Sequence, residues 1–203
     1  MKSIKILCRD EMVQIRQSTP DILEHTRVIS INEPEEKPVF EVTHSNVLTV
    51  HFHDIDLDIW PDCVNHTRYV VFNLELARQV MKFIEESAPF DELIVHCYQG
   101  ISRSGAIGAF ACKYFKLRDS LREARKGGIC PNKYILKILN DVAHKRNIEL
   151  RTKTFRVDLI QHRRDSYVQS VELRATSERA ARLAAQRIHP HLLIRNITEL
   201  PKA

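Results

Sequence analysis

Short apolar runs alternate with apolar stripes of helical spacing along the first two thirds of the chain. The runs predict four buried strands, at residues 4–7, 27–31, 47–52 and 93–95. The stripes predict helices over residues 10–16 and 73–86, and Asn73 is placed to cap the second of them. Because strands alternate with helices, the pattern predicts an α/β fold with a mostly parallel central sheet and helices on both faces.

Three more helices are predicted after the fourth strand. One begins at Arg103, and a short one covers residues 120–125 and ends at Gly127-Gly128. Pro131 is expected in the first turn of the last helix, whose apolar stripe reaches Val142. The sequence therefore supplies enough helices to cover both faces of the predicted sheet.

Residues 151–203 follow a different order of elements. The pattern predicts a strand over residues 155–159, a turn at 163–166, a strand over 167–175, a helix, and a strand over 191–195. Thr176 or Ser177 is expected to cap the helix. This tail is therefore predicted to be a small ββαβ unit.

The tail also differs from the rest of the chain in charge. It holds eleven Lys/Arg and five Asp/Glu, a net of +6, whereas the whole chain carries +5. We therefore predict two domains, residues 1–150 and residues 151–203. Few aromatic residues accompany the charge, so a solvated surface is the simpler interpretation, with nucleic acid or an acidic partner as the alternative. The arginines that would form such a basic face are Arg163, Arg164, Arg179, Arg182 and Arg187.

The composition favours an intracellular protein without a metal or cofactor. Five cysteines with no paired spacing predict reduced thiols, and His51 and His53 alternate on a strand with no third ligand evident. The first ten residues lack the apolar region of a signal peptide, and no stretch reaches transmembrane length. We therefore expect a cytoplasmic protein that does not associate with membranes.

The candidate chemistry lies in residues 95–105, Val-His-Cys-Tyr-Gln-Gly-Ile-Ser-Arg-Ser-Gly. A buried strand delivers Cys97 to the end of the sheet, and a buried helix begins at Arg103. The residues between them must turn tightly, so their backbone N–H groups converge on one point at a helix N-terminus and attract an anion. Arg103 adds a planar fork that matches two phosphate oxygens. The segment therefore predicts a phosphate cradle with a nucleophile at its floor.

This segment resembles the signature loop of the cysteine-based protein tyrosine phosphatases, His-Cys-x5-Arg-Ser, which matches residues 96–104. Residues 4 to about 146 also resemble a compact bacterial family of tyrosine-phosphatase-like proteins of dual-specificity size. That resemblance rests on the signature loop together with Phe52-His53-Asp54-Ile55 and Pro131-Asn132. It implies a dual-specificity-phosphatase-like fold and hydrolysis of phosphomonoesters without metal.

The resemblance also implies roles for the loop residues. Cys97 would attack phosphorus and become a phosphocysteine, while Arg103 and the loop N–H groups would hold the equatorial oxygens. Ser104 would donate a hydrogen bond to the cysteine sulfur, and His96 would support the backbone bonds that fix the loop. The predicted phosphate-binding positions are Tyr98, Gln99, Gly100, Ile101, Ser102 and Arg103.

The general acid is open at this point. Asp54 ends the alternating pattern of a predicted strand, and the general acid of small dual-specificity phosphatases follows a strand in the same register. We therefore prefer Asp54 as the acid. Asp62 is the alternative, because Trp60-Pro61-Asp62 spells the acid-bearing loop of the larger tyrosine-specific enzymes. Asp56 and Asp58 are weaker candidates.

The expected substrate is a phosphorylated protein or a small aryl phosphate. No lysine lies within the signature loop, which favours a singly phosphorylated residue over a highly charged inositol lipid. Two other functions remain open: a catalytically weak phosphate-binding module, and an RNA 5′-phosphatase that would use the basic tail.

Overall fold

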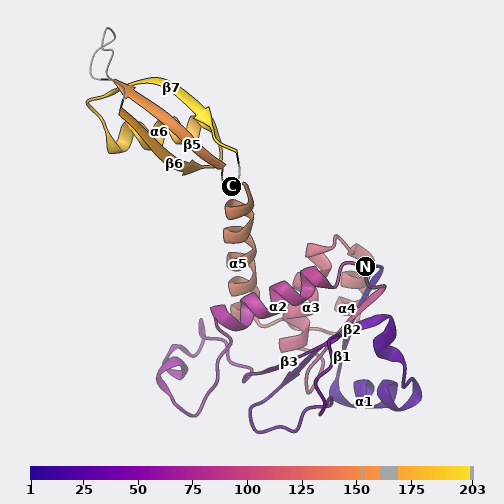
Figure 1. The fold of residues 1–203 in the computed structure, drawn as a ribbon. Helices are drawn as coiled ribbons and strands as arrows, with labels where there is room; N and C mark the ends of the chain where they lie inside the picture. The colour runs from indigo at the N-terminus through magenta and orange to yellow at the C-terminus, as the bar shows by residue number, and fades with distance from the viewer. Residues whose placement is uncertain (152, 161–168, 202–203) are drawn as a thin grey trace. The chain divides into compact units, whose positions relative to one another are not determined.

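The computed structural model describes residues 1–151, 153–160 and 169–201, and the side chains of all of these except 148–151. The chain divides into two compact units, Met1–Ala143 and His144–Ala203. Figure 1 shows the first as a sheet with helices around it and the second as a small sheet with one helix.

The sheet of the first unit is entirely parallel. Its strands are β1 (Ser3–Leu7), β2 (Thr26–Asn32), β3 (Val47–His51) and β4 (Glu92–His96), in the order β1-β4-β2-β3. Parallel strands need crossover connections, and these are supplied by helices and long loops. The carboxyl ends of β2, β3 and β4 therefore meet at one edge, where ligands bind in open parallel sheets.

Helices cover both faces of this sheet, which confirms the predicted α/β fold (Figure 1). They are α1 (Arg9–Ser18), α2 (Leu74–Glu86), α3 (Arg103–Tyr114), α4 (Arg118–Lys126) and α5 (Lys133–Arg151), with short 3₁₀ helices η1 (Ile22–Glu24) and η2 (Pro61–Asn65). Met12 of α1 packs on one face with Val28 and Ile94. Buried residues of α2, α3 and α5 pack on the other face with Ile29 and Val95.

The start of the last helix in this unit differs from the prediction. The helix begins at Lys133, and Asn132 caps it by accepting the N–H of Ile135 at 3.1 Å. Pro131 thus precedes the cap instead of lying in the first turn, because the amide oxygen of Asn132 satisfies a free helical N–H that proline could not. By contrast, Asn73 caps α2 as expected.

The helix α5 is also longer than the apolar stripe suggested. It continues to Arg151, and the boundary between the two compact units falls within it, between Ala143 and His144. Among the described side chains of α5, Val142 and Ala143 are the last that pack on the core of the first unit, and the stripe ends there.

The second unit is a ββαβ arrangement, as predicted. Its elements are β5 (Lys153–Ile160), β6 (Gln169–Ala175), α6 (Glu178–Ile188) and β7 (Leu193–Glu199), and the antiparallel sheet has the order β6-β5-β7. Phe155, Val157 and Leu159 pack with Ala181 and Ala185 of α6 in a core of their own.

Details of the second unit refine the sequence-based expectations. Ser177 caps α6 by accepting the N–H of Ala180, so it is Ser177 and not Thr176 that takes this position. The last strand begins two residues later than expected and extends to Glu199. The predicted turn at 163–166, with two of the five arginines of the proposed basic face, lies outside the described residues. Among the helices of the described chain, none has the length and apolar character needed to cross a membrane.

Candidate active site

Cys97 lies at the carboxyl end of β4, at the floor of the predicted cradle. It is 3% exposed, and its Sγ lies 3.1 Å from the Oγ of Ser104 in the first turn of α3. Gly100 turns the loop with a φ of +74°, and a Cβ there would lie 2.7 Å from the backbone nitrogen of Cys8. Only glycine combines that conformation with so close an approach to the β1–α1 junction.

Arg103 is buried and held at the first residue of α3. Its Nη1 donates to the carbonyl oxygen of Phe52 at 2.9 Å, and its Nη2 lies 3.3 Å from a carboxylate oxygen of Glu33. Its Nε is buried and has no partner among the described residues. Because an unpaired buried donor is costly, this nitrogen is available to an anion that enters the site.

One cavity of about 460 Å³ joins the candidate catalytic residues. Cys97, Arg103 and Asp54 all line it. The other lining residues are Glu33, Glu36, Tyr98, Gln99 and Ser102. The structure therefore brings the predicted nucleophile, the predicted phosphate ligand and the preferred acid to a single opening.

Asp54 follows β3 and faces this cavity, tethered by two side chains. Its Oδ1 accepts hydrogen bonds from Ser102 Oγ at 2.9 Å and from Asn132 Nδ2 at 3.0 Å. The hydroxyl of Ser102, one of the predicted phosphate-binding positions, thus donates to the aspartate. Gly100 and Ile101, two further predicted positions, line a second cavity, and phosphate binding by the loop N–H groups stays a prediction.

The other aspartates lie elsewhere. Asp62 lies in η2, next to the exposed Trp60, and lines a separate hollow of about 410 Å³ that none of the signature-loop residues line. Asp58 forms an ion pair with Lys137 at 2.9 Å, and Asp56 accepts the N–H of Asp58. These placements favour Asp54 over the alternatives.

His96 does not support the loop in the way the sequence suggested. It is 1% exposed, and neither ring nitrogen has a hydrogen-bond partner among the described residues. Its ring lies near that of Phe40, with 6.4 Å between centroids. Burial lowers the pKa of His96 from 6.5 to about 4, and the charge of Arg9 adds to this effect. The neutral ring therefore acts by filling space behind the loop.

This burial predicts that stability depends on pH through His96. As pH falls from 6.5 towards 4, the unfolded chain binds the proton first, because the folded ring resists charging. The loss is complete below about pH 4 and amounts to on the order of 3 kcal/mol. Chemical denaturation across this range should show a steeper decline for the wild type than for His96→Phe. The exposed His25→Phe should keep the wild-type slope, and equal slopes in all three proteins would contradict this prediction.

Sequence reasoning missed three residues of the site. Glu33 directly follows β2 and pairs with Arg103, and Glu36 accepts the N–H of Glu33 at 2.8 Å. Both lie in the loop after β2, and the adjacency of β2 and β4 in the sheet brings that loop to the cavity. The sequence signal that could have identified Glu33 and Glu36 is the presence of polar residues at the end of a buried strand. Asn132 was noted only as part of a motif.

A group of possible cation ligands lies beside the cavity. Among the described residues, oxygens of Glu33 and Glu35 and a ring nitrogen of His53 lie within 4.8 Å of one another. However, Val70 N–H donates to His53 Nδ1, so the neutral ring carries its proton on Nε2, which faces Glu35 at 3.4 Å. This geometry suits a hydrogen-bonded cluster better than a metal site, because a histidine ligand must offer an unprotonated nitrogen.

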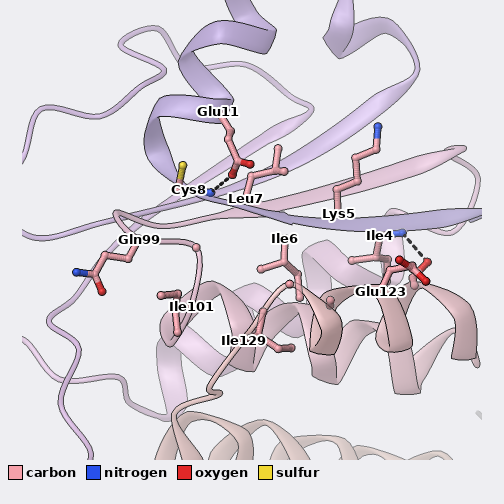
Figure 2. A pocket seen from close by; sticks show the side chains of 14 residues that line it. Ile4, Lys5, Ile6, Leu7, Cys8, Glu11, Gln99, Ile101, Glu123 and Ile129 are labelled. Carbon is pink, nitrogen blue, oxygen red and sulfur yellow. Dashed lines mark hydrogen bonds between the residues drawn. The ribbon is translucent and has the colours of Figure 1, made fainter.

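A larger cavity, of about 580 Å³, lies along β1 (Figure 2). Figure 2 shows Ile4 and Ile6 of β1, Ile129, and Gln99 and Ile101 of the signature loop around it. The Ile4 N–H of the edge strand β1 donates to a serine hydroxyl, and the N–H of Cys8, which precedes α1, donates to a glutamate. Neither Cys97 nor Arg103 lines this cavity, so it does not duplicate the phosphate cradle.

Comparisons with known proteins give similarities of structure at low sequence identity. No protein-family model and no curated protein matches the chain. The structure is similar to human tyrosine phosphatase-like serine/threonine/tyrosine-interacting protein, with 20% identity and a TM-score of 0.43, over 65% of this chain and 86% of that one. It is also similar to Tk-PTP in the active form, with 16% identity and a TM-score of 0.39, over 70% and 90%. At these levels of identity and TM-score, neither similarity bears on the family, substrate or activity of this chain.

Proposed function

We propose that the chain is a phosphomonoester hydrolase that works through a phosphocysteine intermediate, as a protein tyrosine or dual-specificity phosphatase. The observation that carries this proposal is the cavity lined by Cys97, Arg103 and Asp54 together. A nucleophile, a phosphate-binding guanidinium and a proton donor are the three groups that the reaction requires.

In the first step, the thiolate of Cys97 attacks phosphorus opposite the leaving oxygen. The S–P bond forms as the P–O bond to the leaving group breaks, and its electron pair stays on the leaving oxygen. Asp54 supplies the proton that this oxygen needs. Arg103 and the loop N–H groups hold the three equatorial oxygens, where charge accumulates.

The second step returns the enzyme to its starting state. Asp54, now a carboxylate, takes a proton from water as the water oxygen attacks phosphorus. The S–P bond breaks and its electrons return to sulfur, which the hydroxyl of Ser104 stabilises from 3.1 Å. The products are the free thiolate, protonated Asp54 and inorganic phosphate, so the cycle needs no metal or cofactor.

The surroundings of the cavity favour a singly phosphorylated substrate. Glu33 and Glu36 add negative charge beside Arg103, which disfavours a substrate with several phosphates. Tyr98 is 59% exposed and lines the cavity, where its ring can pack against an aryl phosphate. We therefore favour a phosphorylated protein or a small aryl phosphate.

The residues that line the cavity also bear on the two alternative functions. A catalytically weak phosphate-binding module would lack an acid at the cradle, whereas Asp54 lines this cavity. An RNA 5′-phosphatase would bring further phosphates close to the two glutamates, whose negative charge repels them. This alternative is therefore less favoured. We also propose a cytoplasmic location, because all five cysteines are free thiols.

The experiment that tests the proposed function is turnover of para-nitrophenyl phosphate with and without chelator. We expect turnover that chelator leaves unchanged and vanadate inhibits. Wild-type protein that binds vanadate without turnover would support the phosphate-binding module instead. Faster release of phosphate from an RNA 5′ end than from phosphotyrosine would favour the RNA alternative.

The second unit is expected to be dispensable for this chemistry. Its core is formed by its own residues, and each catalytic candidate lies in Met1–Ala143. A chain that ends after Arg151 keeps α5 whole and should hydrolyse a small aryl phosphate at nearly the wild-type rate. Its behaviour towards charged macromolecules should change, because a basic segment is removed. Aggregation or loss of cooperative unfolding in the shortened chain would contradict the two-domain proposal.

A further inference from the structure

Asn132 joins three parts of the site through different atoms. Its backbone N–H donates to the carbonyl oxygen of Ser102 at 3.3 Å, its side-chain oxygen caps α5, and its Nδ2 donates to Asp54 Oδ1 at 3.0 Å. The residue is 7% exposed. Since its backbone and side-chain oxygen are both engaged, the direction of its NH₂ group towards Asp54 is fixed.

The two hydrogen bonds to Asp54 fall on the same oxygen. Ser102 Oγ and Asn132 Nδ2 both donate to Oδ1, and within the described part of the chain Oδ2 accepts none. A carboxyl oxygen has two in-plane lone pairs, and two donors occupy both. While both groups donate to Oδ1, a proton on this carboxyl group resides on Oδ2.

We propose that Asn132 is a positioning residue for the general acid. It holds Oδ1 of Asp54, so that the proton is carried on Oδ2 and this oxygen is presented to the leaving group. Ser102 is the second anchor of the same oxygen. The inference rests on the proposed function, since it assigns a role within that reaction.

Proton transfer makes this role measurable. The proton on Oδ2 moves to the leaving oxygen as the P–O bond breaks, and the electrons of the O–H bond stay on the carboxylate. A poor leaving group depends on this transfer, whereas a good one departs as an anion without it. Loss of positioning should therefore appear only with poor leaving groups.

The variant Asn132→Ser separates this role from helix capping. Serine still caps a helix but has no amide donor to reach Asp54. We expect kcat/KM to fall about tenfold on phenyl phosphate and to change little on 2,4-dinitrophenyl phosphate. Ser102→Ala should show the same selectivity. The matched control is Asn140→Ser on an exposed turn of the same helix. Within the described part of the chain, the Asn140 side chain donates to the Leu136 carbonyl and to no group of the site. With this variant both substrates should react at the wild-type rate.

A double-mutant cycle decides between positioning and a merely structural role. In the Asp54→Asn background, Asn132→Ser should cause no further loss, because the transfer it assists is already absent. Equal losses on both substrates, or losses that multiply in the double variant, would overturn the inference while leaving the proposed function intact. Absence of wild-type turnover, or an Asp54→Asn variant with full activity on phenyl phosphate, would overturn the inference together with the function or acid that it assumes.

Discussion

Replacing Cys97 by serine is expected to abolish turnover of phosphomonoesters, by at least about 10⁴-fold, while leaving the binding of vanadate or phosphate measurable. The hydroxyl of serine is a far weaker nucleophile than a thiolate, but the loop N–H groups and Arg103 remain in place. Initial rates on para-nitrophenyl phosphate and vanadate binding by calorimetry would give the two halves of this result.

The matched control is Cys130→Ser, which makes the same substitution at an exposed cysteine that does not line the cavity. This variant should retain wild-type turnover. Cys112 is unsuited to the comparison, because it is buried in α3 and burial raises its pKa to about 11. Appreciable turnover by Cys97→Ser would refute the phosphocysteine mechanism.

The second large effect is expected at Asp54. Asp54→Asn should lower turnover by roughly 10²–10⁴-fold on substrates with poor leaving groups, because asparagine cannot donate the proton. The loss should shrink as the leaving group improves. A plot of log kcat/KM, which reports the step that expels the leaving group, against leaving-group pKa would show this as a steeper slope for the variant than for the wild type.

Asp62→Asn provides the comparison for this prediction. Asp62 lines a separate hollow and does not line the cavity of Cys97, so its replacement should leave the slope unchanged. If Asp62→Asn steepened the slope and Asp54→Asn did not, the Trp60-Pro61-Asp62 interpretation would be right. The loop that carries Asp62 would then have to approach the cavity during turnover.

The cradle could be predicted because its parts are contiguous in the chain. A short loop joins Cys97 and Arg103. Because a strand precedes this loop and a helix follows it, the loop can adopt few conformations. Gly100 satisfies the one position that needs a positive φ. The layered architecture was predicted because strand-like apolar runs alternate with helix-like apolar stripes. The parallel sheet was predicted because helices connect successive strands.

The remaining parts could not be predicted because they come from distant segments. Glu33 approaches Arg103 only because β2 lies beside β4 in the strand order β1-β4-β2-β3. Asn132 reaches Asp54 only because its segment pairs with the signature loop at Ser102. Neither pairing leaves a periodic signal in the sequence.

The sequence by itself identified the candidate nucleophile and the candidate phosphate-binding arginine, and it determined the layered fold and the change of architecture in the tail. These depend on local periodicity and on residues close together in the chain, where backbone geometry leaves little freedom. Only the tertiary structure decided which aspartate lines the cavity, which side chains hold it, and that the ring nitrogens of His96 have no hydrogen-bond partner among the described residues. Those features depend on strand order and on the meeting of segments tens of residues apart, which side-chain packing settles and local propensity does not.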